Sequence, residues 1–332
     1  HAANAPVVIA HNSLSGTAML VAEARARGQI AFCETAPQYL LLDNGVYEGV
    51  GASTTTEPWR LLFNKELRAE AAKHPEIELI VRDAMDSVPR QVADMEELIA
   101  AGVDAILISP KVTEALTPPV SRAYAAGLPV FVLDRDVSND RYTQYIGGDN
   151  REIGRAAGSK AVELLGGAGR AKGKVLEIWG GMASSPANDR HDGFAEVIAA
   201  EPGIRIINPP QDADWKQDMA YGIMTEALDT WPRIDLVYAH NDPMAYGAYL
   251  AARDAGREAD IAFLGIDGIP AEGVKWVNEG ILDATFLYKT PGDEGIRQAL
   301  RFLDGKRVEK RLTLPTLTID KANAAEILER YG

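Results

Sequence analysis

Short apolar runs alternate with amphipathic stretches along most of this chain. From Gly45 onward, strand-like runs such as residues 105–109 and 130–133 are separated by segments whose apolar residues recur at helical spacing. Gly102 and Gly127 stand where helix C-caps are expected, immediately before new strands. Repeated strand–helix–strand order predicts an α/β fold with parallel sheets and helices on both of their faces.

The pattern predicts two successive series of elements with a pause at residues 145–150. The first series has strands at 46–52, 77–81, 105–109 and 130–133 and helices at 58–73, 88–101 and 116–126. The second has helices at 151–165, 192–200, 216–228 and 243–255 and strands at 173–179, 204–208, 236–239 and 261–266. A strand-like run at 284–288, a helix at 294–303, an extended tail at 311–320 and a helix at 322–330 complete the chain.

Length predicts more than one domain. A chain of 332 residues is too long for one small core and suggests about two domains. No low-complexity tract or long linker separates the two series, so we expect short, hinge-like crossings between two lobes. Residues 1–44 carry a β-α-β pattern of their own, at 6–10, 17–27 and 30–32, and we expect them to pack outside the first lobe as an N-terminal extension.

Charge and cysteine content exclude several classes of function. The net charge of −14 argues against nucleic acid or an anionic membrane as partner, because both demand a basic face. The single Cys33 excludes an intrachain disulfide and a multi-cysteine metal site, and leaves the compartment open. No run approaches the roughly 18 apolar residues of a membrane helix. No basic n-region precedes an apolar h-region, so we expect that any secretory signal has been removed.

Indole and planar polar side chains recur just past predicted strand ends. They are Trp59, Asp134, Arg135, Asp189, Arg190, Trp215, Asn241, Asp242 and Asp267. Ligands of open α/β sheets bind outside the carboxyl ends of the strands. A flat apolar wall with bidentate hydrogen-bonding groups around it suits an uncharged polyhydroxylated ring. The pattern therefore predicts a sugar-binding protein.

Each of these residues also has a structural interpretation. Trp59 could be a core residue, and Asp134 with Arg135 could form a surface ion pair. Asn241 and Asp242 precede Pro243 as a helix N-cap would, and we assign Asn241 to the ligand and Asp242 to the cap. Asp189 either contacts the ligand or orients Arg190, and Trp215 stands at a helix start.

Catalytic and metal-binding motifs are missing from the sequence. The five His residues lack metal-ligand spacing, and no Gly-x-Ser-x-Gly elbow occurs. We therefore expect no enzyme activity, no cofactor and no metal.

The chain from about Gly45 to its end resembles the periplasmic sugar-binding proteins of ABC transporters, a group that includes ribose- and galactofuranose-binding proteins. The matching segments are TEPWR at 56–60, GVDAILISP at 102–110, GLPVFVLDR at 127–135, IGGDN at 146–150, SSPANDRHDGF at 184–194, YAHNDPMA at 238–245 and GIDG at 265–268. The resemblance implies the type I periplasmic binding fold, with two Rossmann-like lobes joined by three strands and the sugar between them. It places residues 45–147 with 289–316 in the N-terminal lobe and 148–288 with 317–332 in the C-terminal lobe.

The resemblance also implies roles for single residues. Trp59 and Arg60 fall where the family often carries an aromatic pair, and Asp134 and Arg135 match the pair that grips ring hydroxyls. In the second lobe, Arg190, Asn241 and Asp267 match the polar ligand contacts and Trp215 matches the stacking aromatic. Ser109 and Tyr288 stand where ribose binders carry Asn and Gln. These two departures favour a furanose-capable pentose or hexose, or a polyol, over ribose.

The function implied is capture of a monosaccharide or polyol by hinge closure and delivery to a membrane permease. We expect a monomer that is periplasmic, or extracytoplasmic and lipid-anchored, with no nucleic-acid partner. A sugar-sensing effector domain of a LacI-type regulator and a chemoreceptor ligand-binding protein are the alternatives. The regulator would need a basic helix-turn-helix headpiece, which residues 1–44 lack.

Residues 7–48 are similar to a segment of dihydropyrimidinase and hydantoinase barrels. In those enzymes a His in the position of His11 would ligate metal, but the His-x-His pair and the bridging lysine are absent here. We expect no hydrolase activity from this segment.

Overall fold

The structure is a computed structural model that describes residues 7–9, 31–33 and 57–331. The chain divides into two units, residues 1–49 and 50–332. In the first unit β1 (Val7–Ile9) pairs in parallel with β2 (Ala31–Cys33), which agrees with the two strands expected there. The helix expected at 17–27 and the strand expected at 46–52 lie outside the described residues, and the packing of the extension stays a prediction.

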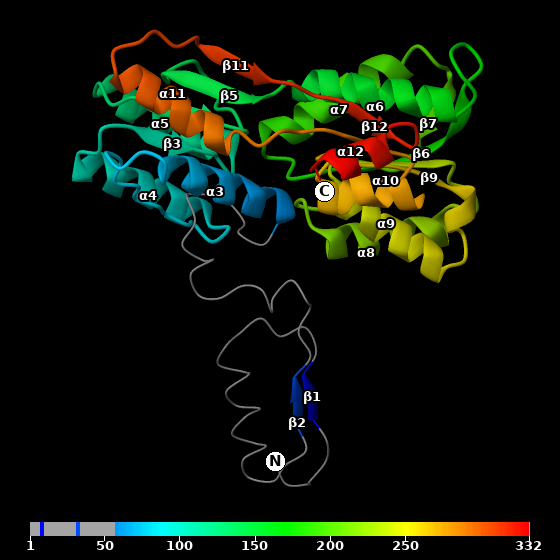
Figure 1. Cartoon of the computed structure of the whole chain (residues 1–332). Helices are drawn as coiled ribbons and strands as arrows, with labels where there is room; N and C mark the ends of the chain where they lie inside the picture. Colours follow the sequence, from blue (N-terminus) through cyan, green and yellow to red (C-terminus); the bar gives the residue numbers. More distant parts are fainter. Residues whose placement is uncertain (1–6, 10–30, 34–56, 332) are drawn as a thin grey trace. The chain divides into compact units, whose positions relative to one another are not determined.

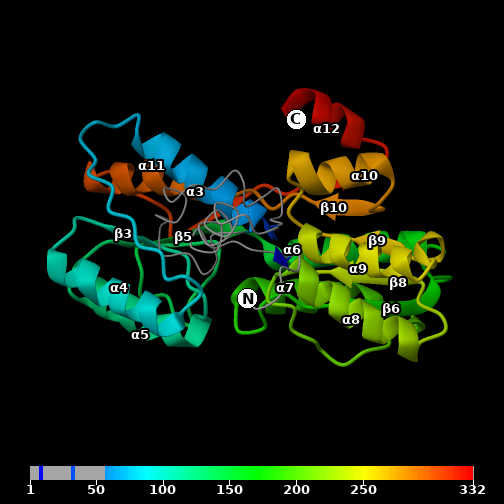
Figure 2. The same cartoon turned by 90° about the horizontal axis from the view of Figure 1, so that it is seen from below.

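The second unit contains two sheets of mainly parallel strands, each with helices on both faces. The first sheet has the order β11-β5-β4-β3 and consists of β3 (Ile106–Ile108), β4 (Val130–Leu133), β5 (Gln144–Gly148) and β11 (Arg311–Leu314). One face is covered by α3 (Pro58–Ala71) and α11 (Gly292–Leu303), and the other by α4 (Val88–Ala101) and α5 (Thr113–Ala125) (Figure 2). We call this sheet with its helices the first lobe.

The second sheet has the order β12-β10-β9-β8-β6-β7, with only β12 antiparallel to its neighbour. Its strands are β6 (Lys172–Ile178), β7 (Gly203–Ile206), β8 (Leu236–Ala239), β9 (Ala262–Leu264), β10 (Ala284–Phe286) and β12 (Thr318–Asp320). Its helices are α6 (Asn150–Leu164), α7 (Ser185–Ile198), α8 (Gln217–Thr230), α9 (Asp242–Asp254), α10 (Lys275–Glu279) and α12 (Ala324–Tyr331). The pair α6 and α7 lies on one side of the sheet and the pair α8 and α9 on the other (Figure 1). We call this part the second lobe.

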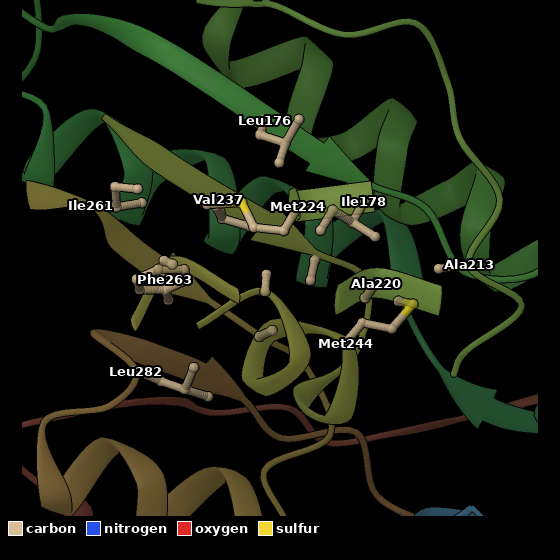
Figure 3. Packing of buried hydrophobic residues seen from close by; sticks show 14 of the residues in the cluster. Leu176, Ile178, Ala213, Ala220, Met224, Val237, Met244, Ile261, Phe263 and Leu282 are labelled. Atoms are coloured by element: carbon tan, nitrogen blue, oxygen red, sulfur yellow. The ribbon is translucent and has the colours of Figure 1, made fainter. Parts of the chain in front are cut away.

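The central strands are buried on both faces, which explains their nearly continuous apolar sequences. Ile178 of β6 and Val237 of β8 pack with Met224 of α8 and Met244 of α9 (Figure 3). The alternate residues of the same strands, such as Val175, belong to a different cluster that includes buried residues of α6 and α7. This alternation follows from the two-residue period of a strand.

Three connections join the lobes in the described part of the chain. They are Asp149 between β5 and α6, residues 287–291 between β10 and α11, and residues 315–317 between β11 and β12. Their shortness agrees with the hinge-like crossings expected from the sequence. The predicted α/β class with two doubly wound lobes is confirmed.

The predicted secondary structure was wrong in three places. Residues 77–81 form no strand, because no described segment provides them with a hydrogen-bonded partner. The pause at 145–150 contains β5, whose glycines concealed its strand character. The helix expected to begin at residue 192 is α7, which already begins at Ser185, since Pro186 supplies a favourable first turn that apolar periodicity does not reveal.

Candidate ligand-binding cleft

A cavity of about 380 Å³, including space open to solvent, lies between the two lobes. Its lining residues are Glu57, Pro58, Trp59, Arg60, Asp134, Arg135, Pro186, Arg190, Trp215, Asn241, Pro243, Asp267 and Tyr288. Most follow the carboxyl end of a strand or occupy the first turn of a helix, as expected for a ligand site on an open α/β sheet.

Trp59 forms an aromatic wall on the first-lobe side. It stands in the first turn of α3, and its indole Nε1–H donates to the Tyr288 carbonyl oxygen at 2.6 Å. Its ring stacks on Phe63 and Tyr288, with centroid distances of 5.9 and 5.2 Å. These contacts fix the plane of the indole, so a ligand meets a preorganised surface.

Trp215 forms the aromatic wall of the second lobe. Its backbone has a φ of 65°, an uncommon value for a bulky residue, and the Asn241 side chain donates to its carbonyl oxygen at 3.1 Å. A Cβ at Gly180 would come within 2.3 Å of the Trp215 ring, so glycine is required there. The indole Nε1–H is buried and has no hydrogen-bond partner among the described residues. A ligand oxygen could therefore satisfy it.

Asp134 is the centre of a buried network in the first lobe. Its carboxylate accepts from Arg60 at 2.8 Å, from the Ser109 hydroxyl at 2.9 Å and from the Tyr288 hydroxyl at 2.8 Å. Burial opposes ionisation, but Arg60 and Arg135 outweigh it and lower the pKa of Asp134 below its ordinary value. The carboxylate is therefore charged, and three of its roughly four acceptor positions are already used.

Two guanidinium groups flank Trp215. The Arg190 and Arg135 guanidinium carbons lie 5.3 and 5.6 Å from the centroid of its ring, within cation–π range. Arg190 is fully buried, donates through Nε to Asn150 at 2.9 Å and bonds through Nη1 to the His240 carbonyl oxygen. Neither bond uses the other terminal nitrogen of Arg190, Nη2.

The second lobe also brings together three acidic groups. Burial, followed by the nearby Asp242, raises the pKa of Asp267 well above its ordinary value. Burial also raises the pKa of Asp242 to about 6 and that of Glu272 to about 7. The Asp267 side chain has no hydrogen bond to another described residue, whereas Asp242 accepts from Gly268 N–H and the Thr285 hydroxyl. The Asp267 carboxyl group is thus available to a ligand at the cavity wall, and in its protonated form it donates as well as accepts.

Nine of the eleven residues predicted to bind ligand line this cavity. The other two, Ser109 and Asp189, do not. Ser109 lies behind the wall, between Arg60 and Asp134, and Asp189 is a partly buried residue of α7. Ligand contact by each of the eleven stays a prediction.

The assignment of the helix cap at 241–242 was wrong. Asn241 is the N-cap of α9, and its side chain accepts from Met244 N–H at 3.0 Å. Asp242 is the first helical residue, and its buried carboxylate accepts from Gly268 N–H, beyond the end of β9, and from the Thr285 hydroxyl in β10. Asn241 also lines the cavity, and its side chain bonds to both Met244 N–H and the Trp215 carbonyl oxygen.

Sequence reasoning did not predict that Glu57, Pro58, Pro186 and Pro243 line the cavity. The three prolines occupy the first turns of α3, α7 and α9, so three helices begin at the cleft. A proline at a helix start was recognisable in the sequence, but it signals a helix and not a ligand site.

His240 and His191 support the second-lobe wall from behind. Both hydrogen-bond Glu177 of β6, at 3.1 and 2.9 Å, and Trp179 packs against both imidazole rings. His240 has no exposed surface and is not among the residues that line the cavity. Across the described residues, no group of three or more His, Cys, Asp or Glu is arranged to hold a metal ion. None of the helices in that part of the chain has the length and apolar character that crossing a bilayer demands.

Comparison with known proteins finds relatives of this chain. Residues 49–307 match the model of the family described as periplasmic binding protein domain. The ribose import binding protein RbsB of Bacillus subtilis is 31% identical over 270 residues, which cover 80% of this chain and 85% of that protein.

Solved structures agree with the family match. The fructose-binding periplasmic domain of a hybrid two-component system superposes with a TM-score of 0.79 at 38% identity, covering 82% of this chain and 90% of that one. A solute-binding protein of an ABC transporter from Bacillus halodurans, with bound myo-inositol, superposes with a TM-score of 0.78 at 26% identity, covering 83% and 94%.

Proposed function

Because this chain belongs to the family of periplasmic binding proteins, we propose that it captures a neutral monosaccharide or polyol between its two lobes and delivers it to the permease of an ABC transporter. The observation that carries the proposal is the cavity between the lobes, lined from both sides by indoles, guanidinium groups and carboxylates.

The lining groups support a division of roles. Trp59 and Trp215 supply apolar faces for the C–H faces of a sugar ring. Asp267 accepts hydrogen bonds from hydroxyl groups, and Arg190 donates to ring or hydroxyl oxygens. Asp134 contributes its one remaining acceptor position. Hydrogen bonds to charged groups contribute about 1.5–3 kcal/mol each, so a few of them suffice for micromolar affinity.

Closure follows from the distribution of these contacts. A ligand that touches Trp59 on the first lobe and Trp215 on the second makes its full set of contacts only when the lobes are closed. Binding therefore shifts the population toward the closed form. A permease that recognises the closed form then meets mainly loaded protein.

The kind of sugar is a finer part of the proposal. Ser109 and Tyr288 replace the Asn and Gln of ribose binders, and both are committed to the Asp134 network. This supports a furanose form of a pentose or hexose, or a polyol, as ligand. We further propose a monomer that acts outside the cytoplasmic membrane.

A panel of pentoses, hexoses, furanose-forming sugars and polyols in a thermal unfolding assay tests the proposal. A ligand at 100 times its Kd adds about 2.7 kcal/mol to the free energy of unfolding. Asp267→Ala should remove the stabilisation, whereas the exposed Asp229→Ala on α8 should leave it unchanged. If no sugar or polyol stabilises the wild type, the proposal is refuted.

A sensor role is the second candidate. The 38% identity to the periplasmic domain of a hybrid two-component system favours it. Stimulation of ATP hydrolysis by the cognate permease in liposomes, with sugar present, would support transport. Sugar binding without any such stimulation would support sensing.

A further inference from the structure

Three loops, two from the first lobe and one from the second, meet at the rim of the cleft through four charged side chains. Asp86 and Lys111 belong to the first lobe, and Asp214 and Lys216 belong to the second. We propose that these four residues, the rim quartet, form an electrostatic latch that holds the lobes closed and positions Trp215 against the ligand.

The charges of the rim quartet alternate around a closed ring. Lys111 Nζ bonds to Asp86 and lies 3.5 Å from Asp214. Lys216 Nζ lies 2.6 Å from Asp214 and 3.4 Å from Asp86. Each side chain therefore contacts one opposite charge of its own lobe and one of the other lobe. Two of the four pairs exist only when the lobes are closed.

The two first-lobe residues of the rim quartet are held in place by buried groups of their own lobe. Met85 and Asp86 have φ values of 48° and 64°, an uncommon left-handed conformation for residues other than glycine. The Asp83 carboxylate stabilises it by accepting from Met85 N–H at 2.8 Å. Gln91, which is 1% exposed, accepts from Lys111 N–H at 2.8 Å. The charges are therefore presented by a rigid backbone.

The two second-lobe residues of the rim quartet are preorganised in the same way. Asp214 and Trp215 have φ values of 46° and 65°. Asp212 accepts from Asp214 N–H at 2.7 Å, and the Asn241 side chain bonds to the Trp215 carbonyl oxygen at 3.1 Å. A non-glycine turn of this kind persists only when its surroundings hold it.

Trp215 connects the rim quartet to the cavity. It follows Asp214 and precedes Lys216, so its backbone lies between the two charges that the first lobe binds. Its indole lines the cavity. Lys111 and Asp86 are thus positioning residues: they act on the ligand through the turn that carries Trp215.

The latch should respond to ionic strength. The side chains of the quartet are 18–39% exposed, so salt screens their attraction. Two other contacts across the cleft are hydrogen bonds between uncharged groups, from Thr113 N–H to the Ala183 carbonyl at 3.1 Å and from Asp136 N–H to the Ser185 hydroxyl at 2.8 Å. These bonds do not depend on salt to the same degree, so closure should weaken but persist at high ionic strength.

A distance measurement between the lobes tests the latch without any ligand. Spin labels at Glu97→Cys on α4 and Asp229→Cys on α8, in a Cys33→Ser background, report the interlobe distance by pulsed electron resonance. We expect a short-distance population in 20 mM salt that falls with Lys111→Met or Lys216→Met and with 500 mM salt. Lys275→Met removes a lysine paired only within its own lobe, with Glu279, and should change nothing.

An affinity measurement extends the test and rests on the proposed function. For the panel sugar with the largest thermal shift, each latch variant should raise Kd about 3- to 10-fold at low salt and much less at 500 mM salt. Identical distance distributions in wild type and latch variants, or no short population in the wild type, overturn the latch. Absence of sugar binding refutes the proposed function alone, because the distance measurement needs no sugar.

Discussion

Removing the Asp134 carboxylate should destabilise the ligand-free protein strongly. The side chains of Asp134 and its partner Arg60 are only 4% and 2% exposed, and they form an ion pair at 2.8 Å. In Asp134→Ala the Arg60 guanidinium stays buried without its counter-charge, and the Ser109 and Tyr288 hydroxyls each lose an acceptor. The variant should be less stable than the wild type, although residue 134 lies at a cavity wall.

The magnitude follows from the burial of the pair. Breaking a buried ion pair by removing one partner costs about 3–5 kcal/mol. Two lost hydrogen bonds at about 1 kcal/mol each favour the upper half of that range. Replacing both partners, in Arg60→Met with Asp134→Ala, removes the stranded charge and should recover at least about 1 kcal/mol relative to Asp134→Ala.

Urea unfolding of the ligand-free protein at pH 7, followed by circular dichroism, measures these differences. Asp229→Ala, an exposed carboxylate on α8, is the matched control and should cost less than about 0.5 kcal/mol. A cost below about 1 kcal/mol for Asp134→Ala would mean that Arg60 is not held by this carboxylate. The reasoning about the first-lobe wall would then be wrong.

Two further predictions concern the second lobe. The raised pKa of Glu272, about 7 against an ordinary 4.5, means that the folded protein binds an extra proton between those values. The free energy of unfolding should therefore fall as pH rises from about 4.5 to 7, by roughly 1–2 kcal/mol from this group after allowance for its partial exposure. Asp242 and Asp267 act in the same direction. Glu272→Gln should flatten urea midpoints between pH 5 and 8, and an unchanged slope would contradict the assignment. Gly180→Ala would place a methyl group 2.3 Å from the Trp215 ring and should weaken sugar affinity at least about 10-fold in a calorimetric titration. Gly222→Ala on α8 has open space around it and should leave affinity unchanged, and equal affinities in both variants would contradict a role for Trp215.

Burial on both faces made much of the fold predictable from sequence. β4 and β8 were predicted at their observed bounds because parallel strands buried on both sides are nearly continuous apolar runs. β5 escaped because Gly147 and Gly148 obscure its pattern. A Cβ at Gly148 would come within 2.7 Å of the Tyr288 ring, a contact 140 residues away in sequence. No local pattern reports such a requirement.

The candidate site was also predictable only in part. Asp134, Asn241 and Asp267 were predicted because each follows an apolar strand within three residues, and the topology brings strand ends together. The partners that hold these residues were not predictable. The bonds of Ser109 and Arg60 to Asp134 join three separate elements, and the acidic group around Asp267 forms only through folding. The cap belongs to Asn241 because the Asp242 carboxylate bonds instead to Gly268 and Thr285, which are distant in sequence.

Calorimetric titration of the wild-type protein with the sugar and polyol panel is the most direct test for a sugar site in the cleft. We expect one saturable site per chain for at least one neutral monosaccharide or polyol, with heat that disappears in Asp267→Ala while that variant keeps its fold. Binding of equal strength in Asp267→Ala, or no heat with any member of the panel, would contradict a sugar site in the cleft.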